Sequence, residues 1–271
     1  MHNVKLIVMD IDGTLLGKGH KVSKKTLDIL KMARAKNIKI CLATGRHFYR
    51  TEEISRIIES DVNNDYLVCL NGGALYKYEN KNLNVIYEKT FSEEEFNYIY
   101  DESKKIKLNC FSYDKNNETA YVVKKSLFTF ILGKVSKRKP VVYDNETKNI
   151  SYKIIGNGKP AAIKKIKQIL QKKSFRIYDW SYSNKSKRIE ISPKDVNKVC
   201  AIKKLAELEK INKEEIVFFG DGDNDKELLS WVKYGVAMGN AHKEVLRHAS
   251  YKTKKNTKDG IEYFLKSILN I

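Results

Sequence analysis

Two clusters of acidic side chains each follow directly on a short apolar run. Asp10 and Asp12 come after a run that ends at Met9, and the segment from Asp221 to Asp225 comes after a run that ends at Phe219. If both runs are strands of one parallel sheet, their carboxyl ends meet at the same edge. Crowded carboxylates repel one another unless a cation lies between them, and hard oxygen ligands suit Mg²⁺. The two clusters together therefore predict a magnesium site.

Simpler interpretations of these clusters were weighed. A single Asp-Gly pair is most often a turn, but two clusters at two strand ends favour chemistry. The stretch from Asp221 is not a calcium loop, because Lys226 stands where the loop needs Gly and Val232 where it needs Glu. The stretch from Gly13 is too short for a nucleoside-triphosphate loop and has Gly19 in place of Ser or Thr. No Gly-rich dinucleotide motif follows any strand.

The apolar runs alternate with amphipathic stretches over both ends of the chain. Runs without polar alternation are typical of strands buried on both faces, so the pattern predicts a Rossmann-like α/β core with a parallel sheet and helices on both faces. The predicted strands are 6–9, 38–42, 66–70, 216–219 and 235–238. The predicted helices are 24–36, 51–59, 198–210, 225–231 and 259–269.

The middle of the chain departs from this βα pattern. Predicted helices at 93–105 and 159–171 stand among strand-like segments, which indicates an α+β unit. The alternation of strands and helices stops before this stretch and resumes after it. We therefore predict a core domain of residues 1–82 plus 189–271 and an inserted domain of residues 83–188. The strand-like segments of the inserted domain are 119–123, 149–155 and 188–191.

Short polar residues and glycines also follow the other predicted strands. Thr44, Gly45 and Arg46 come after the second strand, Asn71 and Gly72 follow the third, and Gly239 with Asn240 follows the fifth. All of these positions belong to the sheet edge where ligands of open α/β sheets bind. The alternative for each one alone is a turn residue, a helix cap or a solvated side chain.

These motifs, in this order, resemble the haloacid dehalogenase superfamily of phosphohydrolases, and more closely its Cof-type subgroup. The resemblance covers both flanking segments, while the middle matches only in length and position, where the family inserts a C2-type cap, here of the C2B kind. The motifs that carry it are DIDGTLL (10–16), LATGR (42–46), LNGGALY (70–76), Lys198 at a helix start, FFGDGDND (218–225) and VAMGNA (236–241).

The resemblance implies a role for each motif residue. Asp10 would be the nucleophile that forms an aspartyl-phosphate, and Asp12 the acid and base. Thr44 and Lys198 would contact the transferring phosphoryl group. The implied magnesium ligands are Asp10, the Asp12 backbone carbonyl and Asp221, with Asn224 and Asp225 as further partners. The implied substrate-binding residues are Thr44, Gly45, Arg46, Asn71, Gly72, Lys198 and Asn240.

Composition limits the partners of the protein. Its 52 Lys and Arg against 33 Asp and Glu give a net charge of +19, which raises the possibility of a polyanion partner. The lysines are spread along the chain without interleaved stacking aromatics, which argues against nucleic acid. No signal-peptide core or long apolar run occurs, and the four cysteines form no paired motif, so we expect a cytoplasmic protein without membrane segments, disulfides or a zinc site.

The sequence thus predicts a magnesium-dependent phosphatase that hydrolyses a small phosphorylated metabolite such as a sugar phosphate. A phosphohexomutase of the same superfamily is one alternative, although the compact GDGDND motif resembles that of the phosphatases. A basic nucleic-acid-binding protein on a catalytically idle scaffold is the other, because of the net charge. No oligomeric state is predicted.

Overall fold

The computed structural model describes residues 3–115, 118–144, 151–179 and 187–269. These fall into two compact units, one formed by Met1–Glu88 with Asn197–Ile271 and the other by Lys89–Val196. The predicted boundaries, 82/83 and 188/189, fall within the strands β5 and β11. Each of these strands runs unbroken in its own sheet, so the chain changes units only after Glu88 and again before Asn197.

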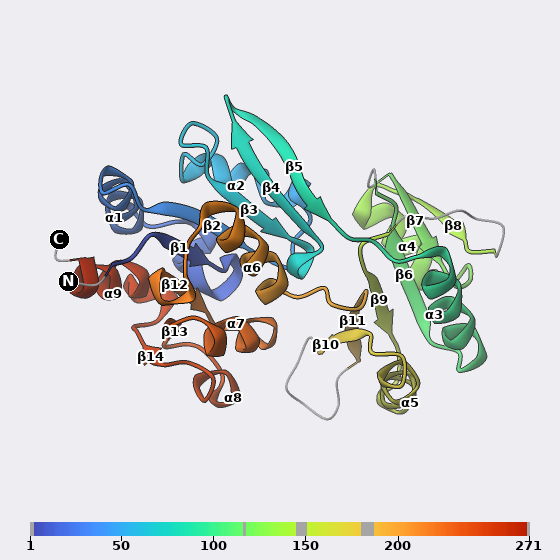
Figure 1. The fold of residues 1–271 in the computed structure, drawn as a ribbon. Coiled ribbons are helices and arrows are strands. Elements are labelled where there is room, and N and C mark those ends of the chain that lie inside the picture. Colours follow the sequence, from blue (N-terminus) through green and yellow to red (C-terminus); the bar gives the residue numbers. More distant parts are fainter. Residues whose placement is uncertain (1–2, 116–117, 145–150, 180–186, 270–271) are drawn as a thin grey trace. The chain divides into compact units, whose positions relative to one another are not determined.

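An eight-stranded sheet forms the centre of the first unit, in the order β14-β13-β12-β1-β2-β3-β4-β5 (Figure 1). The strands from β14 to β3 are parallel, as predicted, and β4 and β5 extend the sheet as an antiparallel hairpin. The bounds are β1 Leu6–Met9, β2 Lys39–Ala43, β3 Tyr66–Cys69, β4 Ala74–Glu79, β5 Asn82–Glu88, β12 Ile216–Gly220, β13 Tyr234–Ala237 and β14 Tyr251–Lys252.

The β4–β5 hairpin was not predicted. Its two connecting residues, Asn80 and Lys81, have φ angles of 51° and 66°. Two left-handed residues in a two-residue loop suit the twist of a hairpin, and Asn-Gly is the usual sequence for it. Lys81 in place of Gly removes that signal, and β5 is half-exposed rather than uniformly apolar. The hairpin therefore has neither the Asn-Gly turn nor the uniformly apolar strand from which a strand pair is inferred.

Helices cover both faces of this sheet. Leu6 and Val8 of β1 belong to a buried cluster with residues of α6 and α7, whereas Phe219 of β12 packs edge-on against Phe264 of α9 on the other face. Because both faces are covered, successive strand residues are all buried, which explains the unalternating apolar runs. The helices are α1 Lys24–Ala35, α2 Glu52–Ile57, α6 Lys198–Glu209, α7 Lys226–Trp231, α8 Lys243–Leu246 and α9 Gly260–Leu269.

The second unit has its own six-stranded sheet, in the order β10-β11-β9-β6-β7-β8. Its neighbours are antiparallel except for β7 and β8. Ile99 of α3 and Ile166 of α5 are fully buried in its core. The bounds are α3 Glu93–Lys105, β6 Asn109–Tyr113, β7 Thr119–Val122, α4 Leu127–Ser136, β8 Lys139–Val142, β9 Ile154–Asn157, α5 Pro160–Gln171, β10 Arg176–Asp179 and β11 Arg188–Ser192.

Several sequence predictions for this unit are confirmed, namely the helices at 93–105 and 159–171 and the strands at 119–123 and 188–191. The predicted strand 149–155 is displaced to Ile154–Asn157, and its residues 149–150 lie outside the described part of the chain.

Within the described residues of both units, no helix is long and apolar enough to cross a membrane.

A buried ion pair in the first unit joins α1 to the residue before β3. Arg34 of α1 donates from Nη2 to Asp65, just before β3, at 2.5 Å, and to the carbonyl of Ile58 at 2.8 Å. Ser60 donates to the same Asp65 carboxylate at 3.0 Å. Burial raises the pKa of Asp65 even though Arg34 and Ser60 oppose that effect. The carboxylate therefore depends on these donors to remain ionised in the core.

We predict that Arg34→Met lowers the free energy of unfolding by about 3 kcal/mol at pH 7, since it strands a buried carboxylate. The loss should shrink as the pH falls, because protonation of Asp65 then removes the unpaired charge. Lys31→Met on the same helix is the control, because the Lys31–Glu59 pair is exposed and is worth less than about 1 kcal/mol. Urea unfolding measures both; equal losses in the two variants would contradict the prediction.

Candidate active site

The carboxyl ends of the central parallel strands bring the predicted site residues to one edge of the first unit. Asp10 follows β1 and donates its backbone N–H to the carbonyl of Phe219 in β12 at 2.9 Å. Thr44 follows β2 and donates its backbone N–H to the carbonyl of Val68 in β3 at 2.8 Å. The sheet ladder thus continues into the loops and fixes which loops are neighbours.

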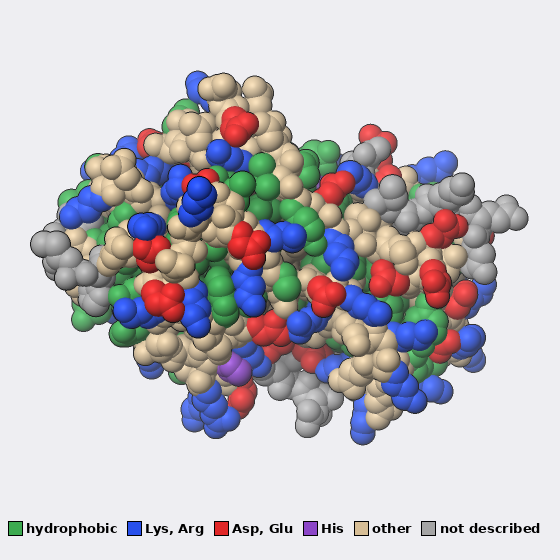
Figure 2. Space-filling model, in the orientation of Figure 1, with side chains coloured by type: hydrophobic (Ala, Val, Ile, Leu, Met, Phe, Trp, Pro, Cys, Tyr) green, Lys and Arg blue, Asp and Glu red, His purple; other side chains and the backbone are tan. Residues whose placement is uncertain are grey.

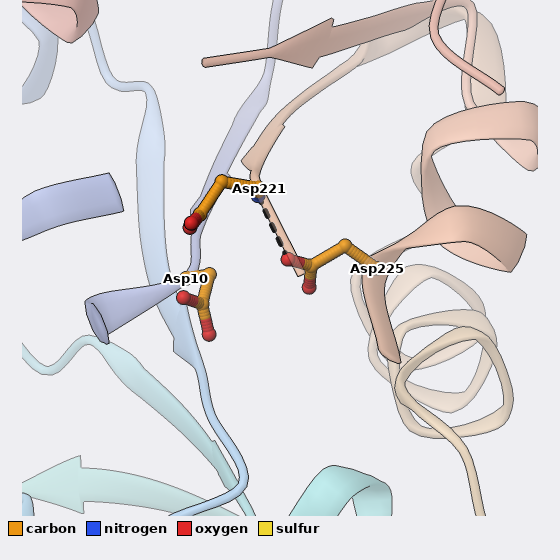
Figure 3. A group of neighbouring side chains, drawn as sticks. All are labelled: Asp10, Asp221 and Asp225. Carbon is orange, nitrogen blue, oxygen red and sulfur yellow. Dashed lines mark hydrogen bonds between the residues drawn. The ribbon is translucent and has the colours of Figure 1, made fainter. Parts of the chain in front are cut away.

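Three carboxylates form the centre of this edge. Asp10, Asp221 and Asp225 each offer an oxygen within 4.8 Å of the others (Figure 3). Asp10 and Asp225 are buried and Asp221 is half-buried. In Figure 3 the side chain of Asp221 points toward Asp10, and Asp225 accepts a hydrogen bond from the Asp221 backbone. Three acidic groups from two segments of the chain therefore share one small volume.

Lys198, at the start of α6, neutralises part of this charge. Its ammonium group is completely buried and lies 2.6 Å from Asp10 Oδ1 and 2.7 Å from Asp225 Oδ1. Burial alone lowers the pKa of a lysine, but the attraction of Asp10 and Asp225 outweighs burial and raises the pKa of Lys198. The lysine is therefore a fixed positive charge beside Asp10.

Asp225 organises the loop after β12. While its Oδ1 accepts from Lys198, its Oδ2 accepts from the backbone N–H groups of Asp221 and Gly222 at 2.9 and 2.8 Å. A side chain at Gly220 would collide with Asp225, since a Cβ there would lie 2.6 Å from its carboxyl carbon. Asp225 thus holds both the lysine and the backbone that carries Asp221.

Three residues outside the acidic cluster shape the surroundings of Asp221. Thr14 donates its hydroxyl to Asp221 Oδ1 at 2.7 Å, and Asn240 donates to Asp221 Oδ2 at 3.3 Å and to the Gly13 carbonyl at 2.8 Å. Gly13 has a φ of 83°, and a Cβ there would lie 2.2 Å from Asp221 Oδ2. Only glycine lets the first loop approach this carboxylate so closely.

The Asp12 side chain is bound by Arg46. Its side chain is 57% exposed, and its two oxygens accept from Nη2 and Nε of Arg46 at 2.5 and 2.6 Å. This two-pronged hydrogen bond is the main cause that raises the pKa of Arg46. Arg46 also donates to the carbonyl of Arg50 at 3.2 Å. Arg46, which was expected to contact the substrate, therefore binds Asp12, the predicted general acid, in this structure.

The loops after β2 and β3 are joined to the acidic loop by amide contacts. Asn71 accepts from Asn224 Nδ2 at 2.6 Å, and its backbone N–H donates to the Thr44 carbonyl at 3.0 Å. The buried Thr44 hydroxyl accepts from the Arg46 backbone N–H at 3.2 Å. Gly45 leaves room for the Asn71 side chain, because a Cβ there would lie 3.0 Å from Asn71 Oδ1. These contacts hold the loops in one arrangement.

The donor set fits a hard divalent cation. The cluster consists of carboxylate oxygens, which Mg²⁺ prefers. Burial, together with repulsion from neighbouring carboxylates, raises the pKa of Asp10 despite the opposing Lys198, and it raises the pKa of Asp221 to about 6. Carboxylates that resist ionisation in the free protein gain the most from a cation beside them. The residues present therefore suit Mg²⁺.

The structure brings the sequence-predicted residues into one connected group. Asp10, Asp221, Asp225 and Lys198 form its centre, whereas Asp12 lies on Arg46. The sequence analysis missed Thr14 and Asn197; the latter precedes Lys198 and caps α6. Thr14 belongs to the quoted DIDGTLL motif, which was a usable signal. Gly72 lies against the backbone of Asn197. The other predicted residues are linked to this centre through the contacts given above, and they are Thr44, Gly45, Asn71, Asn224 and Asn240.

The chain matches the model of the haloacid dehalogenase-like hydrolase family over residues 7–265. It is 27% identical over 271 residues to a Bacillus subtilis protein named "Putative phosphatase YxeH", with 98% of each chain covered. It is 24% identical over 259 residues to 5-amino-6-(5-phospho-D-ribitylamino)uracil phosphatase YcsE of the same organism, with 96% of this chain and 93% of the relative covered.

Solved structures share the fold. BT1666 from Bacteroides thetaiotaomicron superposes with a TM-score of 0.84 at 23% identity, covering 100% of this chain and 97% of that one. The subclass IIB sugar phosphatase BT4131 superposes with a TM-score of 0.79 at 24% identity, covering 99% and 100%. The fold class predicted from the sequence, a parallel-sheet α/β core with an additional α+β unit, is confirmed.

The protein thus has a parallel-sheet α/β core with an acidic site at the carboxyl edge of the sheet. It belongs to the haloacid dehalogenase-like hydrolase family, and the expected kinship with Cof-type phosphatases, which places it among the phosphomonoesterases, is confirmed.

We predict that, in EDTA, Asp221→Asn is at least as stable as the wild type at pH 7, because it removes a crowded charge. Asp221 has a raised pKa, so the folded protein keeps its proton while the unfolded chain has lost it, and this contribution to stability falls as the pH rises from about 4 to 6. The difference between the two proteins should therefore vanish toward pH 4.

Addition of Mg²⁺ should reverse that order by raising the Tm of the wild type and not of Asp221→Asn. Differential scanning calorimetry with and without Mg²⁺ measures both effects. Equal stabilisation of the two proteins by Mg²⁺ would show that the ion binds elsewhere.

Proposed function

We propose that this protein is a magnesium-dependent phosphatase that hydrolyses a small organic phosphate monoester through an aspartyl-phosphate on Asp10. The observation that carries this proposal is the buried Asp10 carboxylate at a strand end, in contact with Lys198 and beside Asp221. Phosphoryl transfer needs a nucleophile, neutralisation of the phosphoryl oxygens and a proton for the leaving group. The site offers a residue for each need.

Asp10 acts as the nucleophile. One of its carboxylate oxygens forms a bond to phosphorus while the bond from phosphorus to the ester oxygen breaks, and the leaving oxygen takes a proton from Asp12. Asp12 then removes a proton from water, the water oxygen bonds to phosphorus, and the bond to Asp10 breaks. An alcohol and inorganic phosphate are released, and both aspartates return to their starting forms.

Lys198 supplies a positive charge at the place where negative charge crowds. Its ammonium group is held by Asp10 and Asp225 at 2.6 and 2.7 Å, so it is already oriented before a phosphate arrives. A preoriented charge costs no rearrangement during the reaction. The Thr44 hydroxyl, at the next strand end, is a further donor for a phosphoryl oxygen.

Arg46 controls the position of Asp12. In the structure its guanidinium group occupies both oxygens of the Asp12 carboxylate. Protonation of either Asp12 oxygen would weaken the hydrogen bond that this oxygen accepts from Arg46. An anionic substrate can compete for the same guanidinium group, which would couple substrate binding to release of the acid.

Magnesium would be held by the carboxylates of Asp10 and Asp221 and by the backbone carbonyl of Asp12. Asp225 and Asn224 would support these ligands, since their side chains already bind Lys198, the Asp221 backbone and Asn71. When bound, the ion supplies positive charge that draws the phosphate toward Asp10 and offsets the repulsion among the carboxylates.

The substrate class we propose is a small phosphorylated metabolite of the cytoplasm, with a sugar phosphate as the first candidate. The support is the likeness to the sugar phosphatase BT4131 and to YcsE, a 5-amino-6-(5-phospho-D-ribitylamino)uracil phosphatase. We assign substrate selection to the inserted unit, Lys89–Val196, as a cap domain of the C2B type.

The positive net charge does not favour nucleic acid as the ligand. On the face drawn in Figure 2, Lys and Arg side chains are interspersed with Asp and Glu rather than gathered in one basic patch. Many lysines also have acidic partners, such as Lys39 with Glu209 and Lys167 with Asp179. A dispersed positive charge of this kind raises the local concentration of any phosphate ester.

We predict that the purified protein hydrolyses p-nitrophenyl phosphate with Mg²⁺ and that Asp10→Asn lowers kcat/KM at least about a thousandfold, since the nucleophile is lost. Asp28→Asn, on the exposed side of α1, should match the wild type. Circular dichroism checks that both variants are folded. A folded Asp10→Asn variant that keeps wild-type turnover would remove the proposed mechanism.

We predict that Asp12→Asn lowers kcat about a hundredfold or more while KM changes little, because a proton donor acts mainly in the transition state. The loss should be smaller for p-nitrophenyl phosphate, whose leaving group needs little protonation, than for an alkyl phosphate such as a sugar phosphate. Steady-state kinetics on both substrates provide the comparison. Equal losses on the two would show that Asp12 does not protonate the leaving oxygen.

A further inference from the structure

The residue before Lys198 makes three separate contacts that fix the start of α6. Asn197 is the first residue of the first unit after the inserted segment, and it is only 5% exposed. Its side-chain oxygen accepts the backbone N–H of Cys200 at 2.7 Å, which makes it the N-cap of α6. An N-cap satisfies a backbone donor that the helix itself leaves unpaired.

The other end of the same amide is tethered to α7. Asn197 Nδ2 donates to Glu227 Oε2 at 2.6 Å. Glu227 lies two residues after Asp225, in the helix that begins directly after the acidic loop. The Asn197 amide therefore joins the start of α6 to the segment that carries Asp225. These two elements supply the two ends of the Lys198–Asp225 ion pair.

The backbone of Asn197 is enclosed by the loop after β3. A Cβ at Gly72, whose φ is 99°, would lie 2.1 Å from the Asn197 carbonyl oxygen and 3.2 Å from the Lys198 nitrogen. The loop and the helix start are thus in close backbone contact. The start of α6 is held from the β3 side by Gly72 and from the α7 side by Glu227.

We propose that Asn197 is a positioning residue that sets the place of the Lys198 ammonium group between Asp10 and Asp225. Lys198 is the first residue of α6, so its Cα moves with the cap, and its side chain is too long to define its own end point. The 2.6 and 2.7 Å contacts require that the helix start be fixed. This inference rests on the proposed function for its kinetic consequence.

Asn197→Ala tests the proposal, because it removes the cap and the tether together. We expect kcat for p-nitrophenyl phosphate to fall about tenfold to a hundredfold, the range found for residues that support catalytic groups. KM should change by less than about threefold, since the loss concerns a charge needed most in the transition state. Kinetics are measured well below the Tm of each variant, per mole of folded protein.

Two further variants separate the cap from the tether. Asn197→Ser keeps an oxygen that can cap α6 and should recover part of the lost kcat. Glu227→Ala removes only the tether and should give a smaller loss than Asn197→Ala. Ser23→Ala is the matched control, because Ser23 caps α1 through Thr26 at 3.2 Å and has no link to Lys198. It should leave kcat at the wild-type value.

The proposal is overturned if folded Asn197→Ala has wild-type kcat, or if Ser23→Ala loses as much kcat as Asn197→Ala. A wild-type protein that releases phosphate from no ester would instead refute the proposed function. Unfolding measurements then decide the positioning role. Asn197→Ala should lower the free energy of unfolding more in the wild-type background than in the Lys198→Met background. Ser23→Ala should lower it by the same amount in both backgrounds. Equal losses for Asn197→Ala in the two backgrounds would overturn the inference.

Discussion

The site depends on one interaction, the buried ammonium group of Lys198 between Asp10 and Asp225. Without it, three carboxylates would crowd a region from which water is largely removed, and ionising them together would be strongly unfavourable. With it, Asp10 has a fixed cation on one side and has Asp221 as a close neighbour in the acidic cluster. The surrounding hydrogen bonds serve mainly to keep this arrangement of charges in place.

The loops reach this arrangement with few side chains, but it requires glycine at several backbone positions. Gly13, Gly72 and Gly220 each stand where a Cβ would collide with a carboxylate or a backbone carbonyl, namely those of Asp221, Asn197 and Asp225 in turn. Asp225 then ties together three groups with two oxygens. Glycine at the points of closest approach and a shared acceptor at the centre let the loops after these strands pack closely around the three carboxylates.

Much of the fold and of the site could be predicted from the sequence, for reasons that particular residues make clear. Strands such as Leu6–Met9 are covered on both faces, so they appear as unbroken apolar runs followed by a polar group. The β4–β5 hairpin lacks alternation and has Asn80-Lys81 as its turn, so it gave no such pattern. Arg46 was assigned to substrate, because a contact with Asp12, 34 residues away, leaves no trace in local spacing. The contact of Asn197 with Glu227, 30 residues away, was missed for the same reason.

The place where the chain returns from the inserted segment has a practical consequence. Asn197 is the first residue after the boundary between the two units, and it directly precedes Lys198. The chain at this boundary therefore cannot be treated as a neutral linker. A chimera that grafts a foreign domain into this scaffold can exchange everything from Lys89 to Val196. By the positioning role proposed for Asn197, it has to keep this asparagine so that Lys198 stays in place between Asp10 and Asp225, whatever the new domain recognises.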